Sequence, residues 1–294
     1  MKFVLNAEEL TSLQQYLQEN KWIGPDEMVE TARKPGEGNM NYTLRIRTNF
    51  RSFIIKQSRE YVEKFPQIPA PKERAITEGR FYELIQKYPH LAQYTPEINN
   101  MDVETSIIML EDLGETSDMS FIYQPDKVIE KDDLSSIIQF ASGLHQATFP
   151  TETYTAFTNR GMRALNAEHI FNYPFFEENG FNLDDVTEGL QEESKAYKTD
   201  QPLKETIQTL SQYYTEDGPT LLHGDYYPAS WLKTLDGVRI IDPEFCFFGR
   251  AEFDVSVMIA NFSMAKQPEW VNTQVLAEYQ GPSNFDQELM WKLT

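Results

Sequence analysis

Residues 221–244 read LLHGDYYPASWLKTLDGVRIIDPE, and this stretch decides the fold. Its apolar runs predict two strands, at 221–222 and 238–241, and each strand leads into a loop that carries an aspartate. Asp225 and Asp242 are 17 positions apart (242 − 225), which leaves room for a hairpin between them. A strand-ending aspartate alone is often a turn former. The two in this order and spacing predict that a hairpin brings both carboxylates to the same end of a small sheet.

Two carboxylates at one end of a sheet suit phosphoryl transfer from a nucleotide to a hydroxyl. One carboxylate accepts the hydroxyl proton, and the other holds the magnesium ion that bridges the nucleotide phosphates. We therefore predict Asp225 as the catalytic base and Asp242 as a metal ligand. Glu244 follows two residues later, and side chains two apart in extended backbone point the same way. Asp242 and Glu244 are then expected to face one Mg²⁺, which prefers oxygen ligands.

The same stretch resembles a known family. His223-Gly224-Asp225, a polar residue five positions after the aspartate, and a second strand ending in Asp242 are similar to the aminoglycoside phosphotransferase and choline kinase superfamily. The commoner pattern has Asn at the polar position, and this chain has Ser230, a shorter and weaker metal ligand. With Asp242-Pro243-Glu244-Phe245, that variant is most similar to methylthioribose kinase. The resemblance implies a small-molecule kinase that uses ATP and Mg²⁺ and has a bilobal protein-kinase-like fold.

The N-terminal half carries further matches to this family, in the family's order. They are Gly36-Glu37-Gly38-Asn39-Met40-Asn41, Ile55-Lys56-Gln57, Lys72-Glu73-Arg74-Ala75 and Met109-Leu110-Glu111-Asp112-Leu113. By resemblance, Gly36, Gly38 and Asn39 lie over the nucleotide phosphates. Lys56 then contacts the α- and β-phosphates, with Glu78 as its expected partner and Glu73 as the competitor on the same helix. Glu111 and Leu113 would lie in a hinge that pairs with adenine through backbone groups.

Lys56, His223 and Asp254 also have interpretations in which they serve only the structure. Lys56 could be an ordinary solvated lysine at the end of a strand. His223 is expected to be neutral, accepting from and donating to the loop backbone. Asp254 heads the next expected helix, and its capping of that helix and its bracing of the catalytic loop are both left open.

Composition narrows the class of protein. The chain has 294 residues, 40% hydrophobic, enough for one large or two modest cores. Its net charge of 26 − 46 = −20 argues against nucleic acid and anionic membrane as partners. The single Cys246 and four histidines without metal-ligand spacing argue against a disulfide or zinc site. With no signal-peptide pattern, we expect a cytoplasmic protein that binds a small-molecule hydroxyl acceptor, and a homodimer remains open.

The pattern of elements predicts an α+β protein with two lobes. We expect a nucleotide-binding N-lobe of five antiparallel strands at residues 1–112 and a mainly helical C-lobe, with the catalytic and metal loops, at residues 113–294. Strands are expected at 28–33, 42–48, 52–57, 97–98 and 106–110. Helices are expected near 6–19, 71–88, 126–147, 162–171, 184–197, 203–214 and 253–264, the first capped by Asn6.

The predicted function is transfer of the γ-phosphoryl group of ATP to a hydroxyl, with a methylthioribose-like sugar as the favoured acceptor. One departure counts against that sugar. Methylthioribose kinases bear paired arginines beyond the aspartate loop, and this chain has no arginine after Arg250. An aminoglycoside or a choline-like amino alcohol is the alternative acceptor, and a nucleotide-binding pseudokinase with a regulatory role is the alternative of another class. A protein kinase is disfavoured, because no HRD-type loop or APE-like segment follows.

Overall fold

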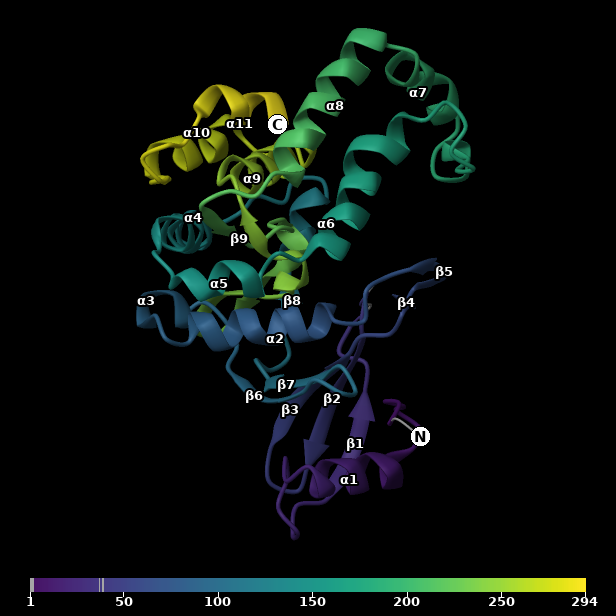
Figure 1. The fold of residues 1–294 in the computed structure, drawn as a ribbon, viewed down its shortest axis with the longest axis vertical. Helices are drawn as coiled ribbons and strands as arrows, with labels where there is room; N and C mark the ends of the chain where they lie inside the picture. The colour runs from purple at the N-terminus through teal and green to yellow at the C-terminus, as the bar shows by residue number, and fades with distance from the viewer. Residues whose placement is uncertain (1–2, 37, 39) are drawn as a thin grey trace.

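The computed structural model describes residues 3–36, 38 and 40–294. The first half contains an antiparallel sheet of five strands in the order β1-β2-β3-β7-β6. Its strands are β1 (Val29–Arg33), β2 (Tyr42–Thr48), β3 (Ser52–Gln57), β6 (Ile98–Asp102) and β7 (Ile107–Glu111). The sheet occupies the lower part of Figure 1, and most helices lie above it. The predicted α+β fold with a five-stranded antiparallel N-lobe is confirmed.

The two faces of β2 and β3 have different neighbours, because side chains alternate along a strand. Leu44 and Ile46 of β2 and Phe53 of β3 pack under α1 (Leu10–Glu19) in one apolar cluster. The residues between them face the opposite side, where the candidate site lies. The helix begins later than expected, since Asn6 Oδ1 accepts from the backbone N–H of Glu8 in a preceding turn (3.1 Å). The prediction that Asn6 caps α1 is therefore wrong.

Helix α2 (Arg74–Ile85) packs on the other side of the sheet, close to β6 and β7. Gly79 permits the close approach: a Cβ there would lie 2.9 Å from Ile108 and 3.0 Å from Ile98. Residues of α2 such as Phe81 share one apolar core with α4 (Lys131–Gln146). The core is continuous across the expected lobe boundary, and the boundary at residues 112/113 stays a prediction.

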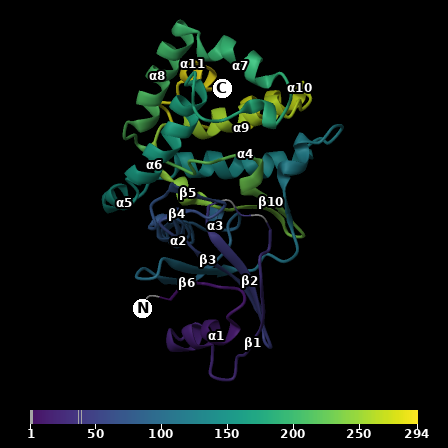
Figure 2. The same cartoon turned by 90° about the vertical axis from the view of Figure 1, so that its right-hand side faces the viewer.

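The second half is mainly helical, as Figures 1 and 2 show. Its helices after α4 are α5 (Thr151–Ala156), α6 (Arg160–Ala167), α7 (Leu190–Lys198), α8 (Gln201–Thr215), α9 (Glu252–Met264), α10 (Glu269–Glu278) and α11 (Gln287–Leu293). The sequence did not predict α5, α10 or α11, nor α3 (Pro89–Ala92) and the hairpin of β4 (Tyr61–Val62) and β5 (Phe65–Pro69) in the first half. Among the described residues, no helix is long and apolar enough to cross a membrane.

Two small sheets carry the stretch at residues 221–244. Strand β9 (Thr220–Leu222) pairs with β12 (Phe247–Gly249), while β10 (Trp231–Thr234) and β11 (Gly237–Ile240) form the expected hairpin. Trp231 lies opposite Ile240, so the loop before β10 and the loop after β11 meet at one edge. Strand β8 (Ser117–Asp118), in the segment that leaves the five-stranded sheet, adds to β10.

Candidate active site

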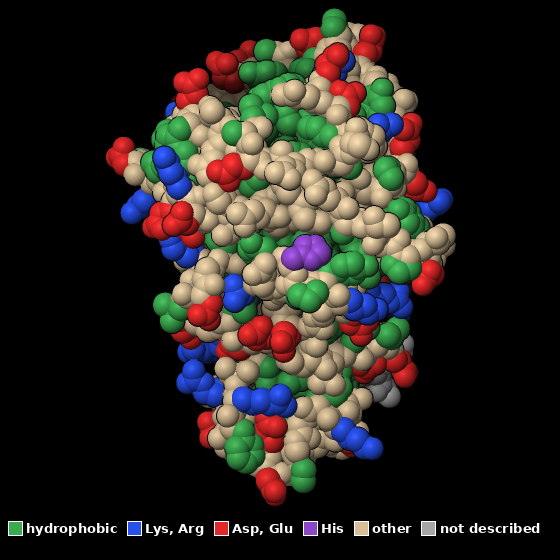
Figure 3. Space-filling model, turned by 90° about the vertical axis from the view of Figure 1, so that its left-hand side faces the viewer, with side chains coloured by type: hydrophobic (Ala, Val, Ile, Leu, Met, Phe, Trp, Pro, Cys, Tyr) green, Lys and Arg blue, Asp and Glu red, His purple; other side chains and the backbone are tan. Residues whose placement is uncertain are grey.

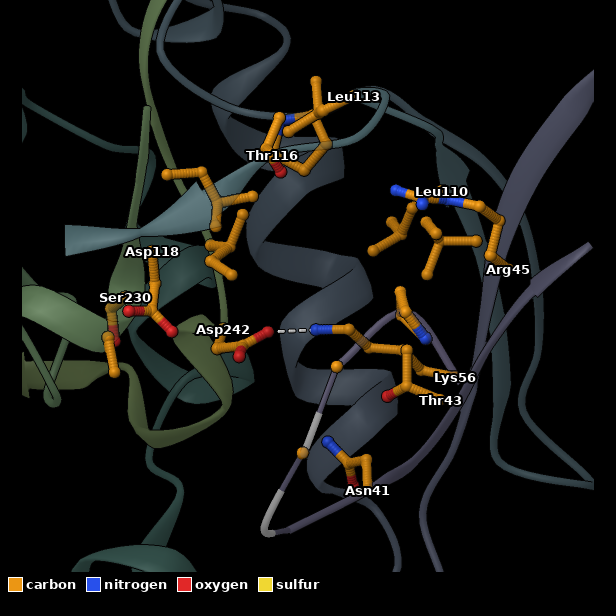
Figure 4. Close-up of a pocket in the computed structure, with 18 of the residues that line it drawn as sticks. Asn41, Thr43, Arg45, Lys56, Leu110, Leu113, Thr116, Asp118, Ser230 and Asp242 are labelled. Atoms are coloured by element: carbon orange, nitrogen blue, oxygen red, sulfur yellow. Dashed lines mark hydrogen bonds and ion pairs between the residues drawn. The ribbon is translucent and has the colours of Figure 1, made fainter. Parts of the chain in front are cut away.

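A cavity of about 410 Å³ lies between the five-stranded sheet and the β10–β11 hairpin (Figure 4). Most of the predicted site residues line it: Gly36, Gly38, Lys56, Glu111, Leu113, Asp225, Ser230, Asp242 and Glu244. Glu78 is fully buried behind Lys56. Asn39 lies outside the described residues. Segments from both halves of the chain therefore meet at one cavity.

Lys56 projects from β3 into this cavity, with only 10% of its side chain exposed. Its Nζ donates to Glu78 Oε1 at 2.7 Å and also to Asp242 Oδ1, the contact drawn as a dashed line in Figure 4. Burial alone would lower the pKa of Lys56, but the two carboxylates outweigh it and raise the pKa. The lysine is thus a fixed cation. Glu73, by contrast, precedes α2 at an exposed position, so the structure places Glu78 and not Glu73 beside Lys56.

Asp225 lies in the loop after β9, which makes a turn that only glycine permits at position 224. Gly224 has φ +82°, and a Cβ there would lie 2.2 Å from the carbonyl oxygen of Phe245. Within the described part of the chain, no hydrogen bond reaches the Asp225 carboxylate. Burial, with the charges of Asp242 and Asp254, raises its pKa to about 7. A cavity-lining carboxylate with this pKa is suited to accept a proton near neutral pH.

Asp254 braces this loop from the first turn of α9. Its two carboxylate oxygens accept the backbone N–H groups of His223 (2.7 Å) and Gly224 (3.0 Å). The side chain is almost fully buried, and Ala251 occupies the cap position of α9. Of the two roles left open for Asp254, the structure shows the brace.

His223 is neutral, as predicted. Its Nε2 lies 2.9 Å from the carbonyl oxygen of Ile241, and its Nδ1 lies 3.3 Å from the backbone nitrogen of Asp225. Nε2–H therefore donates and Nδ1 accepts, which fits one neutral tautomer. Burial lowers the pKa of the imidazole, although nearby carboxylates oppose the shift. The ring joins the two aspartate loops and leaves neither nitrogen available for chemistry.

The loop after β11 departs from the predicted geometry. Asp242 adopts a left-handed conformation (φ +62°, ψ +45°), and Pro243–Phe245 form a short 3₁₀ turn. The expectation that Asp242 and Glu244 lie on extended backbone is therefore wrong, and their shared binding of one cation stays a prediction. The Asp242 side chain is 42% exposed and meets Lys56, whereas the Glu244 side chain is 6% exposed and lies 3.4 Å from Arg74. Aspartate tolerates the left-handed region, and the sequence pattern does not reveal when it does so.

Ser230 is buried against the catalytic loop. Its Oγ donates to the backbone carbonyl of Asp225 at 2.8 Å, so the oxygen keeps lone pairs for a cation. Asp242 offers an exposed carboxylate in the same cavity. Among the described residues, no three Asp, Glu, His or Cys side chains cluster closely enough to hold a metal. These donors fit a Mg²⁺ that takes its remaining oxygens from phosphates and water.

The opposite end of the cavity is bounded by the segment between the two halves of the chain. Ile54 and Leu110 provide apolar surface there, and Arg45 extends from β2 beside them (Figure 4). Arg45 Nε lies 3.1 Å from Asp112 Oδ1, and the guanidinium also donates to the carbonyl of Gly114. Sequence reasoning missed Arg45 and the cavity-lining Asp118. The available signal for Arg45 was alternation, since polar residues at 41, 43 and 45 mark one face of β2.

The five-stranded sheet, the helical second half and the cavity between them define a protein-kinase-like fold. A family model described as "Phosphotransferase enzyme family" matches residues 36–287, and the chain belongs to that family. The resemblance drawn from the two aspartate loops is therefore confirmed.

Relatives of known name point to one subfamily. The chain is 27% identical over 251 residues to a methylthioribose kinase of Klebsiella pneumoniae (strain 342), covering 81% of this chain and 60% of that protein. It is 25% identical over 255 residues to methylthioribose kinase 1 of Oryza sativa subsp. japonica, covering 80% and 56%. The chain thus spans about 60% of the length of such relatives.

Two solved structures share the fold. Choline kinase LicA from Streptococcus pneumoniae aligns with a TM-score of 0.56 at 13% identity, covering 96% of this chain and 85% of that chain. Spectinomycin phosphotransferase APH(9)-Ia, in complex with ADP and spectinomycin, aligns with a TM-score of 0.58 at 12% identity, covering 99% and 84%. At these identities the likeness shows the fold alone.

Proposed function

We propose that this chain is an ATP-dependent kinase that transfers the γ-phosphoryl group to a hydroxyl of a small acceptor. One observation carries the proposal: Lys56, Asp225 and Asp242 reach a single cavity from β3, the loop after β9 and the loop after β11. A fixed cation, a carboxylate of raised pKa and an exposed carboxylate are the groups that phosphoryl transfer requires.

The roles follow from the contacts of each residue. Asp225 orients the acceptor hydroxyl and takes its proton as the new oxygen–phosphorus bond forms. Lys56, held by Glu78, positions the phosphates by charge. Gly36 and Gly38, at the edge of the cavity, cover the phosphates, and Glu111 and Leu113 present backbone groups to the adenine. Catalysis is then mainly positioning and charge neutralisation.

Asp242 is the residue that we expect to hold Mg²⁺, with Ser230 as a neutral second ligand. Mg²⁺ supplies charge neutralisation for the phosphate oxygens. Lys56 pairs with Asp242. We expect the phosphates to bind beside this contact, because Lys56 and a Mg²⁺ held by Asp242 would both act on phosphate oxygens.

The acceptor that we propose first is a methylthioribose-like sugar, supported by the relatives named methylthioribose kinase. A second candidate, a cationic amino alcohol or aminoglycoside, is favoured by charge. Residues 113–294 carry 12 Lys and Arg against 29 Asp and Glu, a net of 12 − 29 = −17, whereas residues 1–112 carry 14 − 17 = −3. Figure 3 shows acidic side chains along the upper part of one face, over the helices, while many basic ones lie lower. The catalytic loop belongs to the acidic half of the chain.

An acceptor screen tests the proposal. Purified protein is incubated with ATP and Mg²⁺ and with methylthioribose, ribose, choline, ethanolamine or an aminoglycoside, and phosphorylated product is detected by ³¹P NMR. We expect acceptor-dependent ADP formation for one class, abolished in Asp225→Asn. Nucleotide binding without transfer to any of these acceptors would favour the pseudokinase, and absence of nucleotide binding would refute the proposed function.

A further inference from the structure

Arg74, the first residue of α2, has a fully buried guanidinium. Its two terminal nitrogens donate to four backbone carbonyl oxygens at distances from 2.6 to 3.0 Å. Those carbonyls belong to Met40, at the end of the Gly-rich stretch, to Arg59, just before β4, to Tyr61, its first residue, and to Pro71, before α2. One side chain therefore joins three segments above the phosphate end of the cavity.

The remaining nitrogen of Arg74 faces Glu244. Nε lies 3.4 Å from Glu244 Oε2, and among the described residues it has no hydrogen-bond partner. Asn41 Nδ2 donates to the same carboxylate oxygen at 3.1 Å. A buried guanidinium requires a nearby opposite charge, because removing it from water is costly. Glu244 is the carboxylate that lies within ion-pair distance of Arg74.

Glu244 is itself held by the second half of the chain. Asn159, before α6, donates through Nδ2 to the backbone carbonyls of Glu244 (2.9 Å) and Cys246 (3.0 Å). Contacts therefore run without a break from the helical half, through Glu244 and Arg74, to Met40. The Gly-rich stretch is tied at its end to the loop that carries Asp242.

The carboxylates of Asp242 and Glu244 differ in their exposure and in their contacts. Asp242 is 42% exposed in the cavity, whereas Glu244 is 6% exposed and already shared between a buried cation and an amide. A ligand for a phosphate-bound Mg²⁺ must present its oxygen to the cavity. Asp242 meets that requirement, whereas Glu244, which also lines the cavity, has its Oε2 oxygen engaged by Arg74 and Asn41.

We propose that Glu244 is a positioning residue. With Arg74 it holds Met40 and Asn41 in place over the nucleotide phosphates. The inference deepens the proposed kinase function and rests on it for the nucleotide.

The variant Glu244→Gln keeps the size of the side chain and removes its charge. Three measurements separate the two roles: the Kd of ADP in EDTA, the Kd of Mg²⁺ for the ADP complex, and hydrogen exchange of the nucleotide-free protein. We expect ADP binding in EDTA to weaken by about fivefold or more, because the ion pair holding the phosphate-binding stretch is lost. Exchange at residues 40–42 and 59–62 should become faster, and the Kd of Mg²⁺ should change by less than about twofold.

The opposite pattern would overturn the proposal. If the Kd of Mg²⁺ rises about tenfold while metal-free ADP binding and exchange stay at parental values, Glu244 is a metal ligand. No change in any measurement would overturn it as well. If the parent binds no ADP, the proposed function fails, while the exchange comparison still decides whether Glu244 holds the stretch.

Two further variants serve as controls. Glu27→Gln makes the same substitution at another buried glutamate, which lies 2.9 Å from the half-exposed Arg51 outside the cavity, and it should leave all three measurements unchanged. Asn41→Ala removes the second contact of Glu244 and should also speed exchange at 40–42. If Glu244→Gln does not fold, Asn41→Ala decides: faster exchange with weaker metal-free ADP binding supports the proposal, and parental behaviour overturns it.

Discussion

The two loops that carry aspartates into the cavity are held in opposite ways. In the loop after β9, the bracing contacts go to the backbone, through Asp254 and His223, and the Asp225 carboxylate is left without a hydrogen bond in the described structure. In the loop after β11, the side chains themselves are engaged, Asp242 with Lys56 and Glu244 with Arg74.

The difference indicates that the loop after β9 serves proton transfer, whereas the loop after β11 serves to bind cations and to connect the two halves of the chain. A general base must be positioned by its backbone, since any partner on its carboxylate would compete with the substrate. The second loop instead offers its charges to cations of the sheet and of α2, and so connects the two halves of the chain around the phosphates. Substitutions in the first loop should act on the rate, and those in the second on nucleotide and metal binding.

The largest effect is expected for Asp225→Asn. Loss of a positioned general base lowers the transfer rate by roughly 10² to 10⁴. Because the carboxylate hydrogen-bonds to no group in the part of the chain that the structure describes, ADP affinity and the folded structure should be kept. Single-turnover rates and calorimetric binding measure the two separately. Turnover within about threefold of the parent would remove Asp225 as the base.

Asp242→Asn provides the contrast in the second loop. It should abolish the Mg²⁺ dependence of nucleotide binding, which Asp225→Asn leaves intact, because it neutralises the exposed carboxylate of the cavity. Equal effects of the two variants on nucleotide binding would erase the distinction between the loops.

Lys56→Ala is expected to have the next largest effect. The lysine touches phosphates in both the ground and transition states, so KM for ATP should rise and kcat should fall, lowering kcat/KM by roughly 10- to 100-fold. Glu78→Ala should do the same more mildly by freeing the lysine. Exposed Glu73→Ala, on the neighbouring turn, is the matched control and should behave as the parent. A larger effect for Glu73→Ala would mean that Lys56 has another partner in the active protein.

A fourth prediction concerns pH and uses the Asp225 carboxylate, which has no hydrogen-bond partner among the described residues. Its pKa is raised from 3.8 to about 7 in the folded protein, so the folded state holds that proton more tightly than the unfolded chain does. The associated stability is complete below about pH 4 and is lost as pH rises through about 7. Asp225→Asn should therefore increase the free energy of unfolding at pH 8 by on the order of 1–2 kcal/mol, with a smaller gain at pH 5.

Urea denaturation of both proteins at pH 5 and pH 8 measures this difference. Asp236→Asn, at an exposed hairpin turn, is the control and should show no such dependence on pH. The same pKa predicts that kcat/KM of the parent rises with pH up to about 7 and then levels. A gain for Asp225→Asn that is equal at both pH values would place the cause outside the titration of Asp225.

The elements that could be predicted from the sequence are those that local backbone geometry determines. Alternation located the strands at 42–48 and 52–57, and the glycine and aspartates of the catalytic loop could be recognised because Gly224 permits a turn that other residues cannot make. The position of Lys56 followed from the end of its strand. These features depend on residues that are close in the chain, so the order of residue types is enough to predict them.

Two kinds of feature could not be predicted from the sequence: the backbone conformation of an individual residue, and contacts between residues that are far apart in the chain. A left-handed Asp242 looks the same in sequence as an extended one, yet the turn that follows it brings Glu244 Oε2 to 3.4 Å from Arg74 Nε. Arg74 lay within a recognised motif, but its four carbonyl acceptors are set by tertiary packing. The helices α10 and α11 lack a clear apolar periodicity of their own. Packing of α10 on α4 and α9, and of α11 on α9, stabilises them as helices.

The smallest effect is expected for Ser230→Ala, at the junction of the two loops. Ser230 Oγ donates to the Asp225 carbonyl, so its loss should cost about 1 kcal/mol of stability and less than about threefold in activity. The Mg²⁺ requirement should also change by less than about threefold, because an anionic Asp242 dominates the binding of a hard cation. The commoner family pattern, with Asn at this position, predicts the reverse, a strong dependence on residue 230. Titration of activity against Mg²⁺ for the parent, Ser230→Ala and Asp242→Asn decides between them. A tenfold rise for Ser230→Ala would make Ser230 a true ligand and would give the first loop a share of the metal, so that the two loops would no longer divide rate from binding.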